Sequence, residues 1–154
     1  MASITKLFGN TRESAKFQLP FINLALVPEF GSSYSLPSRI GHLRAAELLL
    51  LGEPFDAKRA AELGLATRVV PDQDLFATAS KTAQKLAAKP SGALRASKRL
   101  IKQGFIDRVK TAIRVENQAF SERVRSAEAK EALSAFLEKR PPNFTKKLSP
   151  VAVA

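Results

Sequence analysis

The sequence predicts a predominantly helical α/β protein with about two short strands. After residue 33, most of the chain has apolar residues at helical spacing. Apolar and β-branched residues run together without that spacing in two places, residues 17–27 and 65–70. Hydrophobic residues make up 45% of the 154 residues, which is enough for a real core. Two short strands do not form a self-sufficient sheet, so either their partners lie outside this sequence or the sheet is vestigial.

The N-terminal segment is expected to be irregular before the first strand. Residues 1–16 have no clear period and are interpreted as a loose lead-in. Residues 17–27 are broken by Pro20, which favours a short edge strand or an extended segment. Residues 28–33 then form a turn.

The first helical region runs from about residue 33 to residue 51. Pro37 and Gly41 are expected to break it, because proline lacks a backbone donor and glycine is a poor helix former. Gly52 is a suitable residue just beyond the C-terminal end.

Two further helices flank the second predicted strand. Asp56 is expected to cap a short helix over residues 57–63, which Gly64 ends. Residues 65–70 are the second strand, and Asp72 or Asp74 is expected to cap a helix that reaches about residue 88.

The C-terminal part is expected to hold three helices and a disordered tail. The first covers residues 92–102 and ends at Gly104, and the second is amphipathic between Val109 and Val124. Ser126 separates the latter from a final helix with its apolar points between residues 129 and 137. Residues 145–154 are expected to be disordered.

The residue inventory excludes several kinds of site. The chain has no cysteine, which excludes disulfides, a thiol nucleophile and cysteine-ligated metals. His42 is the single histidine, so no metal site is predicted and a surface or packing role is favoured for it. Ser32 and Ser33 lack an adjacent base, so helix N-capping is expected of them rather than nucleophilic catalysis.

The sequence favours a soluble intracellular protein. No apolar run approaches the roughly 20 residues that span a bilayer, and the N-terminus is too polar for a secretory signal. A cytoplasmic location is expected, with the mitochondrial or peroxisomal matrix as the alternative.

The positive charge lies in the second half of the chain. Residues 1–80 hold 8 basic and 8 acidic side chains, whereas residues 81–154 hold 17 basic and 6 acidic ones, which accounts for the net charge of +11. Such a basic half suggests an anionic partner, such as a phosphorylated cofactor or a nucleic acid, or else a solvated lysine-rich surface. The short basic cluster at residues 98–102 lacks interleaved aromatic residues and is weak support for nucleic acid.

Glu29 is the most informative residue, because it is one carboxylate in a tight turn inside an apolar run. A buried charge costs several kcal/mol unless a partner or a function compensates for it. The plain alternative is an exposed turn carboxylate or a helix N-cap partner.

Three blocks in series carry a family resemblance: residues 24–41 with Val-Pro-Glu-Phe-Gly-Ser-Ser, residues 47–71, and residues 131–144 with Phe-Leu-Glu-Lys-Arg-Pro-Pro. In this order and spacing they resemble the C-terminal half of the enoyl-CoA hydratase/isomerase (crotonase) family. The resemblance implies the C-terminal part of an α/β crotonase-like fold over residues 17–144, between the lead-in and the tail.

The resemblance also implies chemistry on an acyl-CoA thioester. Members of the family stabilise an enolate in an oxyanion hole of two backbone N–H groups while carboxylates move protons. They need no cofactor besides the coenzyme A of the substrate. Phe21 occupies the position of one hydratase glutamate, whereas Glu29 matches the catalytic glutamate of the Δ3,Δ2-enoyl-CoA isomerase branch. There, one carboxylate takes a proton from C2 and returns it to C4.

The family's last helix contacts the coenzyme A of a neighbouring subunit, and the matching residues here are Phe136 and Lys139. A ring can face the adenine and an ammonium can meet a phosphate. The alternative is core packing for Phe136 and a solvated Lys139. The resemblance further implies a homo-oligomer, a trimer or a hexamer.

The oxyanion-hole donors of the family come from its N-terminal half, which residues 1–16 do not resemble. Three explanations for this difference stay open: a truncated gene product, an expressed fragment, and a chain that pairs with a separate polypeptide. The alternatives to an enzyme are a catalytically incomplete self-association module and, least favoured, an RNA-binding protein.

Overall fold

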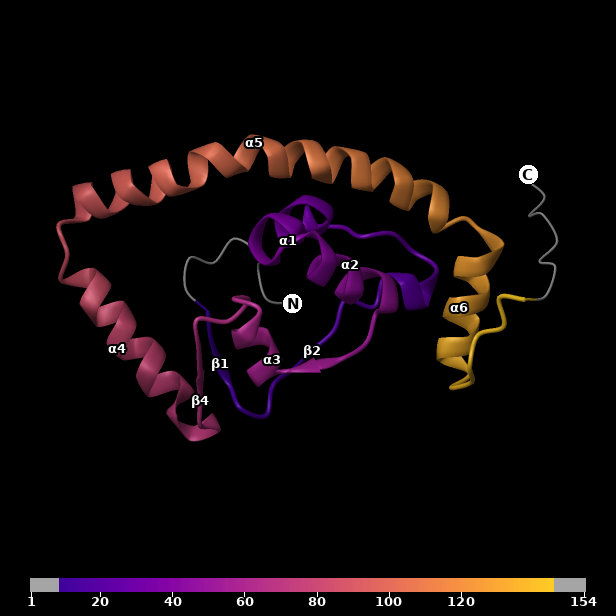
Figure 1. Ribbon diagram of the computed structural model, residues 1–154, viewed down its shortest axis with the longest axis horizontal. Coiled ribbons are helices and arrows are strands. Elements are labelled where there is room, and N and C mark those ends of the chain that lie inside the picture. The colour runs from indigo at the N-terminus through magenta and orange to yellow at the C-terminus, as the bar shows by residue number, and fades with distance from the viewer. Residues whose placement is uncertain (1–8, 146–154) are drawn as a thin grey trace.

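The computed structural model describes residues 9–145 and has an open, arched shape (Figure 1). Helix α5 (Ser91–Arg123) runs along the arch, α4 (Leu75–Ala87) descends from one end, and α6 (Ala127–Leu137) hangs from the other. The remaining elements gather beneath the middle of α5. The predominantly helical α/β fold class is confirmed.

Within residues 9–145, four short strands form two separate pairs. Strand β1 (Asn10–Arg12) is parallel to β4 (Arg68–Val70), with Asn10 opposite Arg68, and β2 (Lys16–Phe17) is antiparallel to β3 (Phe55–Asp56). Strand β4 confirms the predicted strand at residues 65–70. The extended segment predicted at residues 17–27 is only partly correct, because β2 ends at Phe17 and the 3₁₀ helix η1 (Ile22–Leu24) lies within it.

Strands β1 and β3 are not predicted by the sequence, because two or three residues are too few for an alternating pattern. Strand β1 also lies within the stretch that the sequence analysis treats as an irregular lead-in, and its pairing gives those residues a fixed place beside β4. The predicted disordered tail, apart from Thr145, lies outside the described residues.

The central helices form a corner. Helix α1 (Ser32–Ile40) and helix α2 (His42–Leu51) meet at Gly41, whose φ of 84° confirms the break predicted there. The break predicted at Pro37 is wrong, because Pro37 lies inside α1. A proline removes a single intrahelical bond, and the Ser38 hydroxyl donates to the Tyr34 carbonyl at 2.7 Å within the same stretch.

The core is small and lies at this corner. It is a cluster of buried side chains from helices α1 and α2, from the residue just before the short 3₁₀ helix η1 (Ile22–Leu24) and from the residue just after helix α3 (Ala57–Glu62): Phe21, Leu36, Ile40, Ala45, Leu48, Leu49 and Leu63. Phe55 packs against it and stacks on Phe17 with ring centroids 5.6 Å apart, so the β2–β3 pair is joined to the core.

The helix caps agree only in part with the sequence. Asp56 caps α3 (Ala57–Glu62) as predicted, accepting the Arg59 N–H at 2.8 Å. Helix α4 follows a 3₁₀ turn, η2 (Asp72–Asp74), and no side-chain capping bond forms at Asp74.

Helix α5 is continuous over 33 residues, so the predicted break at Gly104 is wrong. A helical glycine costs only about 1 kcal/mol relative to alanine, which good helix formers on both sides overcome. The end of α5 near residue 124 and the start of α6 are as predicted, and Ser126 caps α6 by accepting the Ala129 N–H at 3.1 Å.

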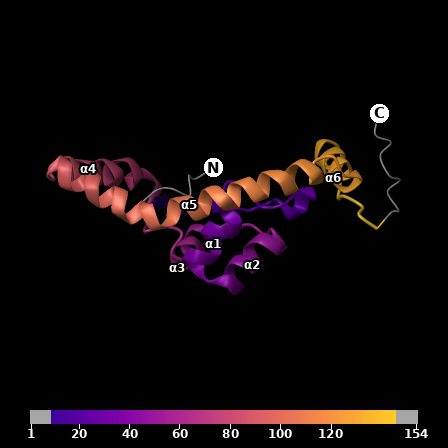
Figure 2. The same cartoon turned by 90° about the horizontal axis from the view of Figure 1, so that it is seen from above.

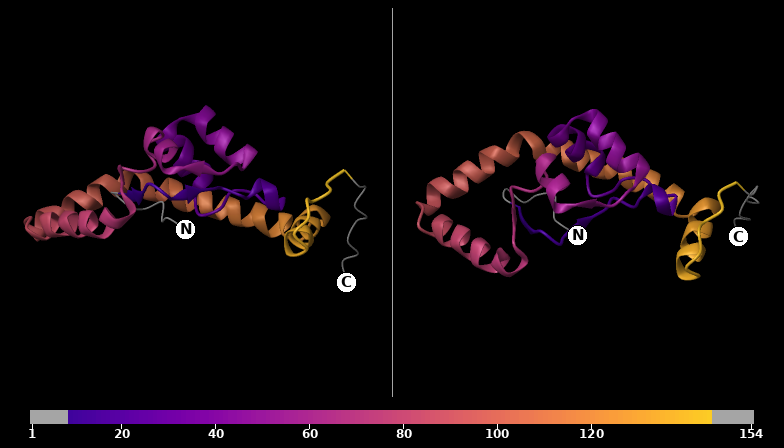
Figure 3. Two further views of the ribbon diagram at one scale, coloured as in Figure 1. Left: turned by 90° about the horizontal axis from the view of Figure 1, so that it is seen from below. Right: turned by 60° about the horizontal axis from the view of Figure 1, so that its bottom comes forward.

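One face of α5 holds the corner of α1 and α2. Figures 2 and 3 show helices α1–α3 gathered on one side of α5. Phe105 contacts Tyr34 with ring centroids 5.6 Å apart, while Val109 and Glu116 are the buried residues of α5. Within residues 9–145, no helix is both long enough and apolar enough to cross a membrane.

Candidate active site

Glu29 lies in a tight turn that leads into α1. The two residues after it have left-handed backbones, with φ of 60° at Phe30 and 74° at Gly31. The Ser32 N–H donates to the Glu29 carbonyl at 3.1 Å and closes the turn. A bulky non-glycine residue rarely adopts a positive φ. Glu29 is half-buried, whereas Phe30 is 57% exposed.

Glu116 of α5 supplies the polar partner of this turn. Its two carboxylate oxygens accept the N–H of Gly31 at 2.6 Å and the N–H of Ser33 at 2.8 Å. Only 5% of Glu116 is exposed, although it carries a charge. Because the first N–H groups of a helix lack intrahelical partners, this carboxylate serves as the cap of α1 from another element.

The prediction that Ser32 or Ser33 caps α1 is therefore wrong. Gly31 occupies the capping position, and the buried Ser32 hydroxyl has no hydrogen-bond partner among the described residues. Glycine is required at position 31 on two counts. Its φ is positive, and a Cβ there would lie 2.8 Å from Cγ1 of Val109.

A second side chain of α5 holds the other end of the same segment. The Arg123 Nε–H donates to the Ala25 carbonyl at 3.2 Å, and its guanidinium pairs with Glu128 of α6. Ala25 itself has a φ of 54° and ends η1. The segment that carries Glu29 is thus fastened to α5 on both sides.

Phe21, which the resemblance places at the position of one hydratase glutamate, is a core residue. It is 7% exposed and belongs to the main hydrophobic cluster. Its carbonyl accepts the Leu26 N–H at 2.9 Å, which shapes the chain between η1 and the Glu29 turn. Phe21 therefore supplies packing where a hydratase would need a carboxylate.

Phe136 and Lys139 lie at the far end of α6, on a different element from Glu29. Phe136 is 71% exposed, which rules out core packing for it within the described structure. Lys139 is exposed, has a φ of 54°, and donates its N–H to the Phe136 carbonyl at 3.2 Å. Both side chains are therefore accessible to a ligand or a partner, and helix α6 packs against η1.

The segment after α6 is held in place by Arg140. Its guanidinium donates to both oxygens of Glu131, at 2.6 and 3.1 Å, and to Glu138 at 2.6 Å. These bonds, first that to Glu131, raise the pKa of Arg140 above its ordinary value. The Asn143 N–H also donates to Glu131. The arrangement orders the residues that follow Phe136 and Lys139.

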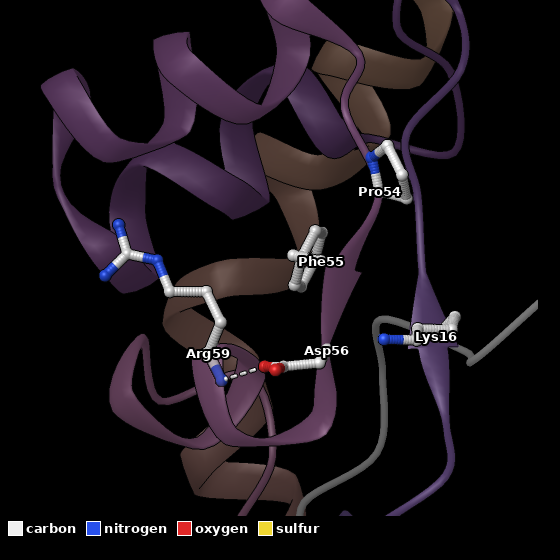
Figure 4. Close-up of a pocket in the computed structure, with 5 residues that line it drawn as sticks. All are labelled: Lys16, Pro54, Phe55, Asp56 and Arg59. Atoms are coloured by element: carbon white, nitrogen blue, oxygen red, sulfur yellow. Dashed lines mark hydrogen bonds between the residues drawn. The ribbon is translucent and has the colours of Figure 1, made fainter.

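A hollow of about 500 Å³ lies elsewhere, between β2, β3 and the start of α3 (Figure 4). Its lining includes Lys16, Asp56 and Arg59. Asp56 already caps α3, and Arg59 pairs with Glu47 and Glu62 at 3.8 and 3.7 Å. Asp56 and Arg59 thus have structural partners, and none of the predicted site residues lines the hollow.

Glu116 was not predicted as a site residue from the sequence, although a signal was present. Residues 109, 113 and 120 define the apolar stripe of the helix, and position 116 falls on the same stripe. A charge on an apolar stripe indicates a buried partner. His42, by contrast, is exposed as expected, and no group of metal-binding side chains occurs in residues 9–145.

The chain is similar to curated proteins over most of its length. Residues 9–147 match the model of the enoyl-CoA hydratase/isomerase family. A 1,2-epoxyphenylacetyl-CoA isomerase of Escherichia coli is 38% identical over 134 residues, which are 87% of this chain and 51% of the relative. A probable enoyl-CoA hydratase of Mycobacterium bovis is 34% identical over 133 residues, 86% of this chain and 52% of the relative.

Solved structures give the same assignment. An enoyl-CoA hydratase/isomerase from Pseudoalteromonas atlantica superimposes with a TM-score of 0.85 at 39% identity, covering 89% of this chain and 55% of that one. The chain thus spans about half the length of the relatives it matches. The match to the family model over all described residues shows that this chain belongs to the enoyl-CoA hydratase/isomerase (crotonase) family, in the part that corresponds to its C-terminal half.

Proposed function

We propose that the chain processes acyl-CoA thioesters as an enoyl-CoA isomerase or hydratase, with Glu29 as the group that moves the proton. The supporting observation is the position of Glu29 in a strained turn whose conformation is fixed from outside by α5. Strained backbones of this kind cluster at functional sites. The family membership supplies the substrate class.

The isomerase reaction suits a site with one carboxylate. The Glu29 carboxylate removes a proton from C2 of a 3-enoyl-CoA, the resulting dienolate shifts the double bond, and the same carboxyl group returns the proton to C4. The product is a 2-enoyl-CoA, and atoms and electrons balance without a co-reactant. Phe21, buried in the core, leaves the neighbouring position without a second carboxylate.

We further propose that Phe136 and Lys139 bind the coenzyme A part of the substrate within a homo-oligomer. Phe136 and Lys139 are both exposed at the end of α6. An exposed ring can stack on the adenine, and the ammonium can pair with a phosphate. The basic excess in residues 81–154 would favour the approach of this polyanion.

The test measures turnover of 3-enoyl-CoA and 2-enoyl-CoA by the wild-type chain and by Glu29→Gln. Glu122→Gln is the matched control, because Glu122 is exposed on α5. We expect Glu29→Gln to abolish isomerisation and Glu122→Gln to leave it unchanged. Equal activity of the wild type and Glu29→Gln would refute the role of Glu29, and a wild type without turnover would favour the non-catalytic alternative.

The coenzyme A contact has its own test. Phe136→Ala should raise the KM for the acyl-CoA with little change in kcat, because a contact with the coenzyme A part is made equally in the ground state and in the transition state. Leu137→Ala is the control on the same helix, since Leu137 is 79% exposed. An equal change of KM in the two variants would contradict a specific contact at Phe136.

A further inference from the structure

Glu116 is a buried charge that the proposed proton transfer does not use. Both of its oxygens are taken by backbone N–H groups at the start of α1, and the residue is 5% exposed. A carboxylate in this environment is stabilised by the two donors and by the positive end of the helix dipole. An uncharged amide of similar size could not accept both N–H groups, so the carboxylate has a specific use at this position.

The bonds of Glu116 act on the strained part of the turn. Gly31, the first donor, follows Phe30, and both residues have a positive φ. The Phe30–Gly31 peptide is therefore fixed by Glu116 at its N–H, while Ser33 anchors the first turn of α1. A left-handed phenylalanine persists only where the surroundings over-determine it. The two bonds supply that constraint from a residue 85 positions away in the sequence.

We infer that Glu116 is a positioning residue for Glu29: its buried carboxylate holds the turn at residues 29–31 and thereby sets where the Glu29 carboxyl group meets the substrate. Glu29 lies two residues before the Gly31 donor, and its own carbonyl accepts the Ser32 N–H between the two anchored amides. The link to turnover rests on the proposed function, whereas the hold on the turn does not.

A purely structural cap would affect the free energy of unfolding alone. The experiment therefore measures the conformation of the turn, the free energy of unfolding and the kinetic constants of each variant. Glu116→Gln keeps the size of the side chain, but its amide offers one carbonyl acceptor and turns an NH₂ donor toward the second N–H. Glu122→Gln makes the same chemical change at an exposed position of the same helix. Glu116→Asp, which keeps the charge but is one methylene shorter, replaces Glu116→Gln if that variant does not fold.

We expect Glu116→Gln to change the turn first. The amide hydrogens of Gly31 and Ser33 should exchange at least ~10-fold faster, as expected for lost hydrogen bonds. The Cα chemical shifts of Phe30 and Gly31 should move away from left-handed values. In the turnover assay kcat should fall about 10- to 100-fold while KM stays within about twofold, because a displaced catalytic group costs rate rather than binding. Glu122→Gln should match the wild type throughout.

Two results would overturn the inference. Unchanged shifts and exchange at Phe30, Gly31 and Ser33 in Glu116→Gln would show that Glu116 does not hold the turn. A changed turn with unchanged kcat would show that Glu116 is a structural cap without a positioning role. A wild type without turnover would count against the proposed function, and the spectra of the turn would then decide whether Glu116 holds it.

Discussion

Gly31→Ala is the sharpest test of the contact between α1 and α5, because it adds a single methyl group where the backbone before α1 comes close to the side chains of α5. The backbone of Gly31 has a φ of 74°, and the added Cβ would lie 2.8 Å from Cγ1 of Val109 and 3.4 Å from Cγ1 of Ile113. Val109 is 6% exposed, so its side chain has little space to move away. Both the backbone and the packing therefore oppose the new side chain.

The expected loss follows from three contributions to the free energy of unfolding. A left-handed alanine costs about 1–2 kcal/mol. Overpacking against Val109 costs about 1–3 kcal/mol. Alanine also lowers the conformational entropy of the unfolded chain, which offsets about 0.4–1 kcal/mol of this destabilisation. These ranges sum to a net destabilisation of about 1–4.6 kcal/mol, with a central value of about 3 kcal/mol, compared with the 5–15 kcal/mol that is typical of a folded domain.

The measurement is urea unfolding of the wild type, Gly31→Ala and Gly104→Ala, followed by circular dichroism. Gly104 is the matched control, because it lies within α5 and a Cβ there meets nothing within 4 Å. Gly104→Ala should stabilise the chain by about 0.8–1 kcal/mol, the difference in helix propensity. Equal free energies of unfolding for Gly31→Ala and the wild type would refute both the left-handed backbone and the close approach of α5.

Two further predictions concern acidic side chains that differ in their bonding. Asp56→Ala should lower the free energy of unfolding by about 1 kcal/mol, because Asp56 caps α3. Asp74→Ala should change it by less than about 0.5 kcal/mol, since Asp74 makes no capping bond; similar losses in the two variants would contradict this assignment. The hydrogen bond from the Ser14 hydroxyl, followed by that from the Ser14 N–H, lowers the pKa of Asp72 below its ordinary 3.8. A lowered folded pKa means that this stabilisation is present above pH 3.8 and is lost as the pH falls through the folded pKa. The difference in Tm between the wild type and Asp72→Asn should therefore be largest near neutral pH and disappear in strong acid, and a difference that persists there would contradict the linkage.

The sequence predicted what depends on local pattern. Asp56 was identified as a cap because a side-chain oxygen three residues before a backbone donor is a local arrangement. Ser126 was identified as the residue that separates the last two helices. Gly41 was identified as a break, and its φ of 84° explains why. The family resemblance, carried by three blocks of sequence, led to the correct fold class.

The errors have two origins. Gly104 was expected to end a helix because glycine is a weak helix former, yet α5 continues through it, since the cost of about 1 kcal/mol is small beside the propensity of its neighbours. The other errors depend on contacts between distant residues. The capping of α1 was assigned to Ser32 and Ser33, whereas the structure uses Glu116. Strand β1 is recognisable only by its pairing with β4, whose residues lie 58 positions later in the sequence. No local pattern contains this information.

The two attachments of α5 to the Glu29 segment limit where insertions and deletions can be tolerated in this helix. Arg123 reaches Ala25 and Glu116 reaches Gly31, so the helix between positions 116 and 123 spaces the two ends of the segment. Seven residues of α-helix measure roughly 10 Å, about two turns, which also brings both side chains to the same face. Inserting or deleting one residue between them would rotate one anchor by about 100° relative to the other. The same insertion before Phe105 would leave this spacing intact, so variation in length is compatible with the first part of α5 and not with the second.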